Sequence, residues 1–357
     1  MIERERLGHA LTAEPAPPPA PLRSWLEAAR IEGIDALLAS RWQSLPDVAQ
    51  SDRAACQDVL RRAGARELLF QSQEQRVLAA LVAEGIDALV LKGAARSRWL
   101  YPEPRLRPRS DLDLLLRSET EFERCRTVLA TLGYADLDAP VLPPSYERAL
   151  RKQIGGGEHC VDAHWRLSNH PAFARCFSFD TLWTRRRLLP GLANGFGLGP
   201  VHAMIHACLH RACNLTDAAG DKLIWLYDIA LLASRMDADE WSDLIVEATA
   251  ARVAEPCRHS FIAARRYFDA TIPESALQSL SLAATRETFR MERAHNLGYR
   301  SWWAFRTLPW SERPRWLWRR LFPEWRYMQA HFGLLRRSQL PKAWILRLMR
   351  LLQAIWR

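Results

Sequence analysis

The segment that most constrains the fold is 110–116, which reads SDLDLLL. Its run of leucines predicts a buried strand, and strand side chains point alternately to opposite faces. Asp111 and Asp113 therefore share one face, with their Cα atoms about 7 Å apart, while Leu112 and Leu114 enter the core. Two carboxylates at this spacing suit one or two Mg²⁺ ions, because magnesium prefers oxygen ligands and commonly binds one or two carboxylates together with substrate phosphates.

A lysine and a glycine follow the hydrophobic strand predicted at 88–91. Lys92 would bring positive charge toward a phosphate, and Gly93 would let the backbone approach it closely. A short helical segment at 94–100 and a proline-broken loop at 101–108 then lead to the aspartates. Together, the lysine-glycine pair and the aspartates indicate a site for a nucleotide polyphosphate.

A third carboxylate would complete such a metal site, since one carboxylate should also orient or deprotonate the attacking hydroxyl. The segment 160–165, CVDAHW, alternates so that Asp162 and His164 share one strand face. A strand beside 110–116 would turn that face toward the two aspartates, which makes Asp162 the candidate. The alternative is that Asp162 is a polar edge residue beside a hairpin, and His164 either faces the site or bonds to a backbone carbonyl.

The aspartate pair also has interpretations that need no metal. The strand could lie exposed at an edge, although its leucines favour burial. Buried carboxylates without partners are costly, so Arg105, Arg107 and Arg109 just upstream are the alternative partners. In that interpretation Asp111 and Asp113 form structural ion pairs and hold no cation.

Three histidines, at 202, 206 and 210, recur every four residues and share one face of a predicted helix. The outer two lie about 12 Å apart, which is too far for one ion, and the segment has no His-Glu-x-x-His pattern. His206 and His210 are therefore candidates for contact with substrate phosphates, although histidines at such positions are more often packed or exposed.

The chain has 357 residues, enough for two domains, and 48% of them are hydrophobic. No stretch reaches the roughly 18 uninterrupted apolar residues of a membrane span. The N-terminus lacks the apolar region of a secretory signal, so we expect a soluble, cytoplasmic protein. Seven cysteines without a Cys-x-x-Cys pair argue against a disulfide framework and a structural zinc cluster.

Sequence patterns divide the chain into three parts. We expect a flexible, proline-rich leader at residues 1–21 and an αβ domain with N-terminal helices at residues 22–170. We expect a helical domain at residues 171–357. A hairpin of strands 146–154 and 158–167 completes a small mixed sheet, so the expected fold class is α+β. The longer helices are expected at 48–82, 119–132, 201–213, 221–234, 238–251, 254–268, 284–295 and 340–356.

The C-terminal region is basic and rich in tryptophan. Residues 286–357 contain 16 Lys and Arg against 4 Glu, and the last 56 residues hold eight of the 15 tryptophans. Such a region can contact nucleic acid, acidic lipid or another polyanion, but charge runs are usually solvated faces, and the irregular tryptophan spacing favours core packing. The last helix, 343–357, is broadly apolar with a thin basic stripe, which favours docking on a partner over peripheral contact with a membrane.

These motifs together resemble the largely uncharacterised bacterial nucleotidyltransferase family of the DNA polymerase β-like superfamily. The resemblance lies in the Lys92-Gly93 strand end, Tyr101-Pro102, Arg107, the DLDLL run at 111–115 and the VDAHW block at 161–165. His206, His210 and residues 222–230 are similar to the helical segment of the family. Residues 321–323 are similar to its C-terminal region. The resemblance covers roughly residues 30–335.

The resemblance implies a two-domain enzyme that binds an NTP with Mg²⁺, or Mn²⁺, and transfers a nucleotidyl group to an acceptor. It implies that Asp111, Asp113 and Asp162 ligate the metal and carry catalysis. The residues that it implies for phosphate binding are Lys92, Gly93 and Arg107. The acceptor is not identified, and a small molecule, a sugar or a peptide is favoured over nucleic acid.

One position departs from the superfamily pattern. Superfamily members carry Gly-Ser or Gly-Gly on the turn before the aspartates, whereas here Gly93 is followed by Ala94 and Ala95. The hydroxyl contact to phosphate is missing, and Lys92 is the candidate replacement. The alternative function is a catalytically inactive binding module of the same fold, which holds a polyanion or a biosynthetic partner through the basic C-terminal region.

Overall fold

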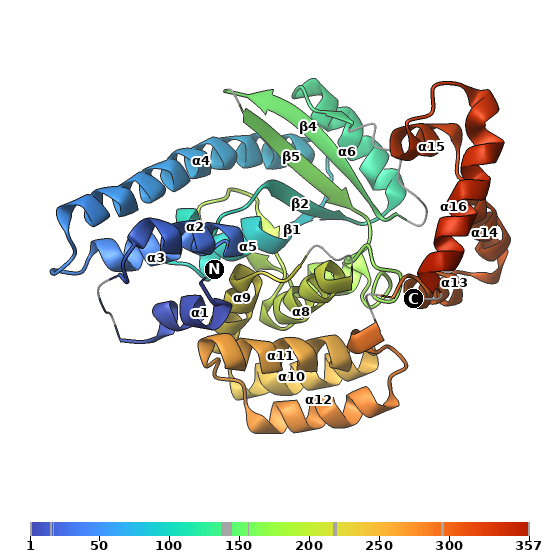
Figure 1. Ribbon diagram of the computed structural model, residues 1–357. Helices are drawn as coiled ribbons and strands as arrows, with labels where there is room; N and C mark the ends of the chain where they lie inside the picture. The colour runs from blue at the N-terminus through green and yellow to red at the C-terminus, as the bar shows by residue number, and fades with distance from the viewer. Residues whose placement is uncertain are drawn as a thin grey trace.

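Seven strands form one mixed sheet at the centre of the molecule (Figure 1), which confirms the α+β fold class. The computed structural model describes residues 2–14, 16, 18–136, 145–155, 157–216, 220–293 and 296–355. Gly156 in the predicted hairpin turn, residues 294–295 of one predicted helix and residues 356–357 lie outside the described residues. The strands are β1 Ala88–Val90, β2 Asp111–Leu116, β3 Ala135–Asp136, β4 Glu147–Ile154, β5 Gly157–His164, β6 Arg187–Leu188 and β7 Phe196–Gly197.

Strand β2 lies inside the sheet because its side chains are apolar on both faces. Leu112, Leu114, Leu115 and Leu116 are all buried, and a strand with two buried faces is typical of a sheet interior. The sheet order is β3-β4-β5-β2-β1-β7-β6. β2 pairs antiparallel with β1 and parallel with β5, so the start of β2 lies beside the middle of β5.

The predicted hairpin is confirmed, because β4 and β5 pair along their whole length, from Glu147 opposite His164 to Ile154 opposite Gly157. The sheet extends further than the sequence predicts. β7 pairs parallel with β1, and β6 pairs antiparallel with β7, so residues 187–197 add strands beyond residue 170. A strand of two residues is too short to show an alternating pattern, so the sequence does not reveal these strands.

Helices cover the sheet and build the rest of the molecule. In the view of Figure 1, α4 and α6 lie above the central strands, α8–α12 lie below them, and α13–α16 form a group at one end. The helices are α1 Arg4–Thr12, α2 Leu22–Glu32, α3 Asp35–Gln43, α4 Gln50–Ala83, α5 Lys92–Trp99, α6 Glu119–Thr131, α7 Phe179–Thr184, α8 Pro200–Thr216, α9 Leu223–Ala233, α10 Ala238–Ala250, α11 Ala254–Phe268, α12 Glu274–Arg286, α13 Leu297–Thr307, α14 Arg313–Leu321, α15 Trp325–Phe332 and α16 Leu340–Ile355.

The helix predicted at 284–295 is wrong, because α12 ends at Arg286. Glu287 leaves the helix in an extended conformation. Its carboxylate accepts hydrogen bonds from the backbone N–H groups of Ala254 (2.7 Å) and Glu255 (3.1 Å). These are the first N–H groups of α11, which have no partner within their own helix. The contact of Glu287 with the start of α11 therefore ends α12, although the helical pattern of the sequence continues past this point.

The leader contains a helix that packs on the body of the protein. Leu7 and Leu11 of α1 are buried, and Arg4 forms an ion pair with Glu32 at 2.9 Å. A Cβ atom at Gly8 would lie 2.5 Å from the carbonyl oxygen of Tyr267, so glycine allows α1 and α11 to approach closely. Residues 4–12 of the predicted leader are therefore not loosely attached to the rest of the protein. The predicted division of the chain into domains stays a prediction.

The C-terminal tryptophans do not fill the core as predicted. Among those that the structure describes, Trp316 is buried and Trp303, Trp325 and Trp344 are half-buried, whereas Trp302, Trp310 and Trp318 are exposed. Helix α16 docks on α13 and α15 within its own group of helices. No helix in the described part of the chain is both long and apolar enough to span a membrane.

We predict that Leu7→Ala lowers the free energy of unfolding by about 2–5 kcal/mol, because it removes buried apolar volume and leaves a cavity. Ile31→Ala, at an exposed position of α2, should change it by less than about 0.5 kcal/mol. Urea denaturation measures both values. Equal, small effects would mean that α1 does not contribute to the core.

Candidate active site

Three aspartates meet where β2 and β5 run side by side. The parallel register places Asp113 directly opposite Asp162. Asp111, Asp113 and Asp162 each offer a carboxylate oxygen, and these oxygens all lie within 4.8 Å of one another. The expectation that the strand of Asp162 lies beside β2 is therefore confirmed, and the three residues form a candidate acidic triad.

Asp113, at the centre of the triad, is paired with two cations. The Nζ atom of Lys92 lies 2.5 Å from its Oδ1 atom, and the Nε2 atom of His164 lies 3.0 Å from the same oxygen. Burial opposes ionisation of Asp113, but Lys92 and His164 outweigh it and hold the pKa of this carboxyl well below its usual value. Asp113 is therefore ionised at neutral pH.

His164 is the second cation beside Asp113. Its Nδ1 atom lies 3.0 Å from a carboxylate oxygen of Glu147 on β4. Burial and Lys92 lower the pKa of His164, but the contacts with Asp113 and Glu147 outweigh them and raise it to about 9. The ring is therefore protonated at neutral pH, and His164 faces the site and does not bond to a backbone carbonyl.

Lys92 reaches the triad from a strained turn at the start of α5. Its φ angle is +47°, a left-handed conformation that side-chain-bearing residues rarely adopt. Such strain persists only where the surrounding structure holds it, and it is concentrated at functional sites. Gly93 follows, where a Cβ atom would lie 3.2 Å from Nη1 of Arg107 and 3.2 Å from Cβ of Arg109. Glycine therefore lets the arginine-bearing loop pass close to the start of α5.

Asp111 and Asp162 are not neutralised in the way that Asp113 is. Burial and the neighbouring Asp113 raise the pKa of Asp111 to about 6, with a further contribution from Asp162. Burial and Asp113 likewise raise the pKa of Asp162. Within the described residues, no Lys or Arg forms an ion pair with either carboxylate. Oxygen ligands with unbalanced negative charge fit a hard divalent cation such as Mg²⁺.

The alternative in which upstream arginines pair with the aspartates is wrong. Arg105 pairs with Glu103 at 2.9 Å, and Arg107 pairs with Asp228 at 2.8 Å. The guanidinium group of Arg109 bonds to Glu67 and Glu74. These arginines are used in contacts with other parts of the chain, so they leave the triad without an arginine counter-charge.

Asp228 of α9 anchors the loop that precedes β2. This fully buried carboxylate accepts hydrogen bonds from Arg107, from Arg96 at 3.0 Å and from the Tyr101 hydroxyl at 2.7 Å. Nη1 of Arg107 donates to the carbonyl of Pro108 at 2.6 Å. Arg107 therefore lines the site, but its guanidinium group is engaged by protein atoms, and its role toward phosphate stays a prediction.

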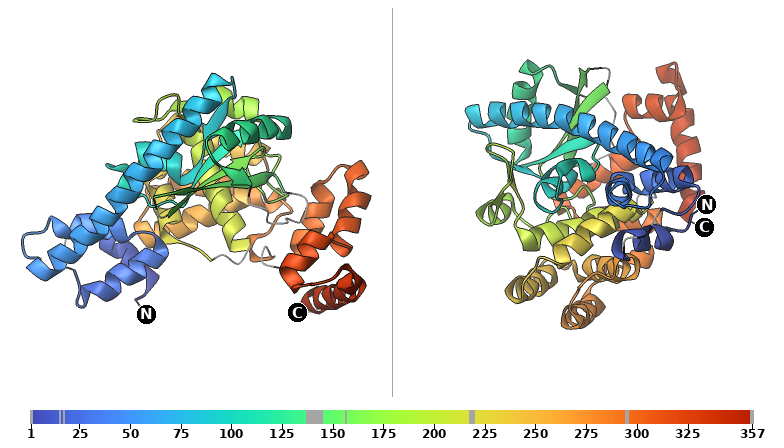
Figure 2. Two further views of the ribbon diagram at one scale, coloured as in Figure 1. Left: turned by 90° about the horizontal axis from the view of Figure 1, so that it is seen from above. Right: turned by 90° about the vertical axis from the view of Figure 1, so that its left-hand side faces the viewer.

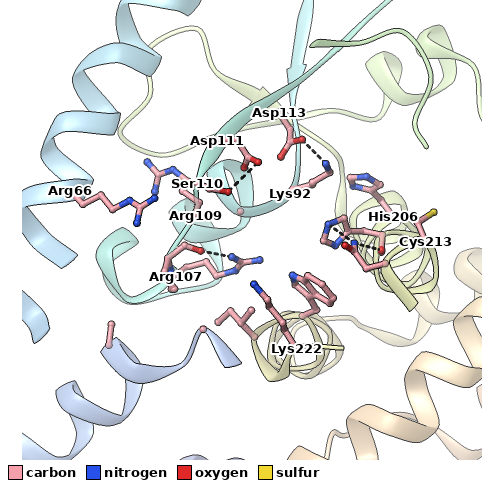
Figure 3. A pocket seen from close by; sticks show the side chains of 18 of the residues that line it. Arg66, Lys92, Arg107, Arg109, Ser110, Asp111, Asp113, His206, Cys213 and Lys222 are labelled. Atoms are coloured by element: carbon pink, nitrogen blue, oxygen red, sulfur yellow. Dashed lines mark hydrogen bonds and ion pairs between the residues drawn. The ribbon is translucent and has the colours of Figure 1, made fainter. Parts of the chain in front are cut away.

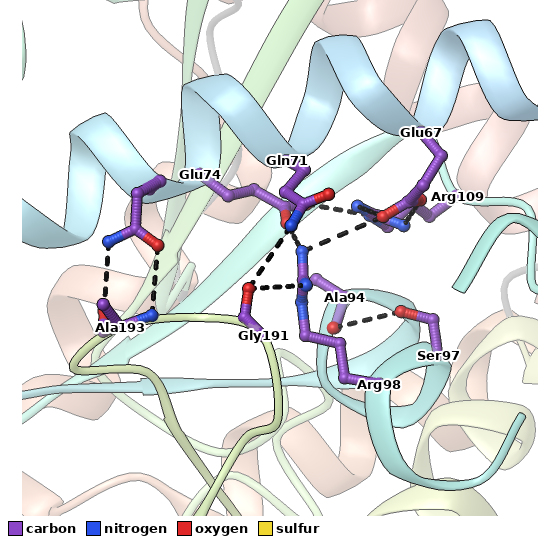
Figure 4. Close-up of polar contacts among 10 residues, drawn as sticks. Glu67, Gln71, Glu74, Ala94, Ser97, Arg98, Arg109, Gly191 and Ala193 are labelled. Carbon is purple, nitrogen blue, oxygen red and sulfur yellow. Dashed lines mark hydrogen bonds and ion pairs between the residues drawn. The ribbon is translucent and has the colours of Figure 1, made fainter. Parts of the chain in front are cut away.

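A second buried carboxylate fixes α4 against the site (Figure 4). Glu74 accepts hydrogen bonds from Arg109 at 2.8 Å and from Arg98 of α5 at 2.7 Å. Arg98 also donates to the carbonyl of Gly191 at 3.3 Å, and Glu67 lies on the other side of Arg109. A carboxylate buried among two arginines holds α4, α5 and the loop before Asp111 in one arrangement.

A cavity of about 750 Å³ opens beside the triad (Figure 3). Its walls come from α2–α4, the start of α5, β2, α8 and α9. Arg30, Arg62, Arg66 and Lys222 line it, and none of these four cations forms an ion pair with a carboxylate of the described residues. The cavity therefore combines acidic metal ligands with unneutralised positive charge, which suits a polyanionic substrate bound together with a cation.

His206 and His210 line the same cavity, whereas His202 packs edge-on against Phe177 at 4.9 Å. Burial lowers the pKa values of His206 and His210 well below the usual value, so both rings are neutral. His210 packs edge-on against Trp225 at 5.0 Å. The structure thus places these two histidines at the cavity, while their contact with substrate stays a prediction.

Several residues at the site were not identified from the sequence. Glu147 gives no sequence signal, and Lys222 belongs to the segment 222–230 that resembles the family but was not singled out as a site residue. Arg62 and Arg66 are four residues apart on α4, so helical spacing alone could have grouped them. Asp228 interrupts the apolar run LIWLYDIALLA, and a lone acid in such a run indicates a buried, paired carboxylate.

The sheet, the acidic triad and the adjoining basic cavity define a nucleotidyltransferase-like site. A family model described as an uncharacterised nucleotidyltransferase matches residues 19–269. This match covers more than half of the chain, so the protein belongs to that family, and the resemblance seen in the motifs is confirmed. The match does not include residues 270–335, to which the expected resemblance extends. The search of curated proteins finds no match to this chain.

We predict that Asp111→Asn stabilises the protein in the absence of divalent cations. The pKa of Asp111 is raised on folding, so its ionised form penalises the folded state above pH 6, and the penalty disappears below about pH 4. The substitution should therefore increase the free energy of unfolding by about 1–3 kcal/mol at pH 8 and by little at pH 4. Urea denaturation in chelator at the two pH values measures this.

The contrasting variant is Asp113→Asn, which leaves Lys92 and His164 without their shared partner. It should lower the free energy of unfolding by about 3–5 kcal/mol at pH 8. This stabilising contribution of Asp113 is present above the unfolded pKa near 4 and fades as the pH falls. Destabilisation of similar size in both variants at pH 8 would contradict the charge distribution described above.

Proposed function

We propose that the protein is a Mg²⁺-dependent enzyme that transfers a nucleotidyl group from an NTP to an acceptor hydroxyl. The observation that supports this most directly is the acidic triad, in which two of three adjacent carboxylates have raised pKa values. Mn²⁺ is the alternative metal, because it accepts the same oxygen ligands. Family membership supports the reaction class and leaves the acceptor open.

In this proposal, Asp111 and Asp113 hold the metal from β2, and Asp162 holds it from β5. A bound Mg²⁺ supplies charge stabilisation at the phosphate oxygens. Lys92 and His164 fix the position of Asp113 and keep it ionised. Asp162, whose pKa is raised above its usual value, accepts the proton of the acceptor hydroxyl. The acceptor oxygen bonds to the α-phosphorus, the bond from that phosphorus to the bridging oxygen breaks, and pyrophosphate leaves.

The phosphates of the NTP would lie along the basic side of the cavity. Lys92 and Gly93 stand at the start of α5, where backbone N–H groups lack helical partners. Arg62 and Arg66 project from α4, and Figure 3 shows Arg66 on the side of Ser110 and Lys222 on the opposite side. This set supplies positive charge along the cavity of a chain that lacks the serine of the superfamily pattern.

The binding-module alternative is not favoured, because it depends on the aspartates pairing with arginines. Those arginines bond to Asp228, Glu67 and Glu74, which supports the enzyme proposal. A small molecule, a sugar or a peptide remains the favoured acceptor over nucleic acid.

We predict that one or more NTPs stabilise the protein in a Mg²⁺-dependent manner. A ligand at 100 times its Kd should add about 2.7 kcal/mol to the free energy of unfolding. The measurement is a thermal-shift panel of ATP, GTP, CTP and UTP with and without Mg²⁺. The Asp111→Asn, Asp113→Asn double variant should lose the effect, and Asp58→Asn on the exposed side of α4 should retain it.

If no NTP shifts the unfolding temperature of the wild-type protein at millimolar concentration with Mg²⁺, the enzyme proposal fails. An equal shift in the wild type and the double variant would place the nucleotide away from the triad.

We further predict that Arg62→Ala and Arg66→Ala each weaken NTP binding by about tenfold, because each removes a charge-assisted hydrogen bond to phosphate. Arg61→Ala is the matched control, since this neighbouring arginine is 77% exposed and pairs with Asp58. Calorimetric titration with the NTP that stabilises the protein measures the change. Equal NTP affinities for all three variants would show that Arg62 and Arg66 do not bind the phosphates.

A further inference from the structure

Helix α16 exposes an apolar strip to solvent. Ile345, Leu346 and Met349 are 60%, 46% and 53% exposed. At 3.6 residues per turn, these three side chains span an arc of about 100° of the helix. Ala343 and Arg347 lie on the other side, and both are buried. The helix therefore docks on its neighbours through one face and leaves these three apolar side chains uncovered.

Basic residues lie within and beside this strip. The exposed Lys342 falls between Met349 and Leu346 around α16, and the exposed Arg350 lies beyond Leu346, over the ring of Phe332. Apolar side chains with cations among them are the pattern of helices that lie in the interface of a membrane, where the apolar side chains enter the acyl boundary and the cations meet anionic headgroups.

The rest of the C-terminal group has the same surface character. Leu317 and Trp318 of α14 are exposed, as are Trp302 and Trp310. The guanidinium group of Arg313 lies 3.7 Å from the ring centre of Trp310. Tryptophan is enriched at the boundary between lipid and water, because its ring is apolar and its N–H group is polar. Figure 2 shows α13–α16 as a group set apart at one end of the molecule, accessible to a large surface.

We propose that the C-terminal group α13–α16 binds the surface of a membrane that contains anionic lipid. Residues 297–355, which span the group, carry 12 Lys and Arg against 2 Glu, so the group complements a negative surface. A second copy of the chain would bring the same positive charge and be repelled. Nucleic acid would neutralise that charge, but it offers no environment for the aliphatic strip of α16. An anionic bilayer satisfies both features.

The test is sedimentation of the full-length protein with vesicles of phosphatidylcholine alone or of phosphatidylcholine mixed with phosphatidylglycerol. The protein should sediment with the anionic vesicles, less so at high salt, and should stay in solution with the neutral ones. The double variant Ile345→Asp, Met349→Asp should bind the anionic vesicles at least about tenfold more weakly, since burial of each apolar side chain accounts for roughly that factor.

The matched control is Val246→Asp, Leu282→Asp, which introduces the same charges at exposed apolar positions of α10 and α12. It should bind vesicles like the wild type, and thermal unfolding of both double variants should match the wild type. Failure of the wild type to bind anionic vesicles, or an equal loss in both double variants, overturns the proposal. Binding to duplex DNA without binding to vesicles also overturns it. Neither result depends on nucleotide binding.

Discussion

The parallel register between β2 and β5 is the constraint on which the candidate site depends. It sets Asp113 opposite Asp162, and the alternation along β2 brings Asp111 to the same face. A shift of one residue would send one set of carboxylates into the core. That shift is unfavourable because it would bury Asp111 and Asp113 on the face where Leu112, Leu114 and Leu116 now pack. Apolar packing and the position of the acids are therefore specified by the same residues.

Two buried carboxylates connect this strand pair to distant parts of the chain. Asp228 brings α9 to the loop before β2, and Glu74 brings α4 to the same loop and to α5. Each holds two arginines, so the loss of either acid would remove the shared counter-charge of two buried cations. The cavity walls formed by α4 and α9 are thus held at fixed positions relative to the triad, as transfer between two bound substrates requires.

The acidic triad could be predicted from the sequence because it depends on local alternation and on one adjacent strand pair. The partners of Arg107 and Arg109 could not, because Asp228 is 121 residues away and Glu67 is 42. Local patterns carry no information about such pairing. The same holds for Glu287, which ends α12 by capping α11, and for the two-residue strands β6 and β7. The fold class was therefore accessible, whereas the electrostatic partners required the tertiary structure.

The pairing of β7 with β1 has a consequence for how the chain can be divided. β1 ends two residues before Lys92, and one of its edges is covered by residues 196–197, which follow the predicted domain boundary at 170. A fragment that ends at residue 170 would expose the backbone groups of β1 along that edge, and uncovered edges of this kind promote aggregation. It would also lack Asp228. Residues 22–170 contain the whole triad, but the strand that covers β1 and the carboxylate that anchors Arg107 both come from later in the chain.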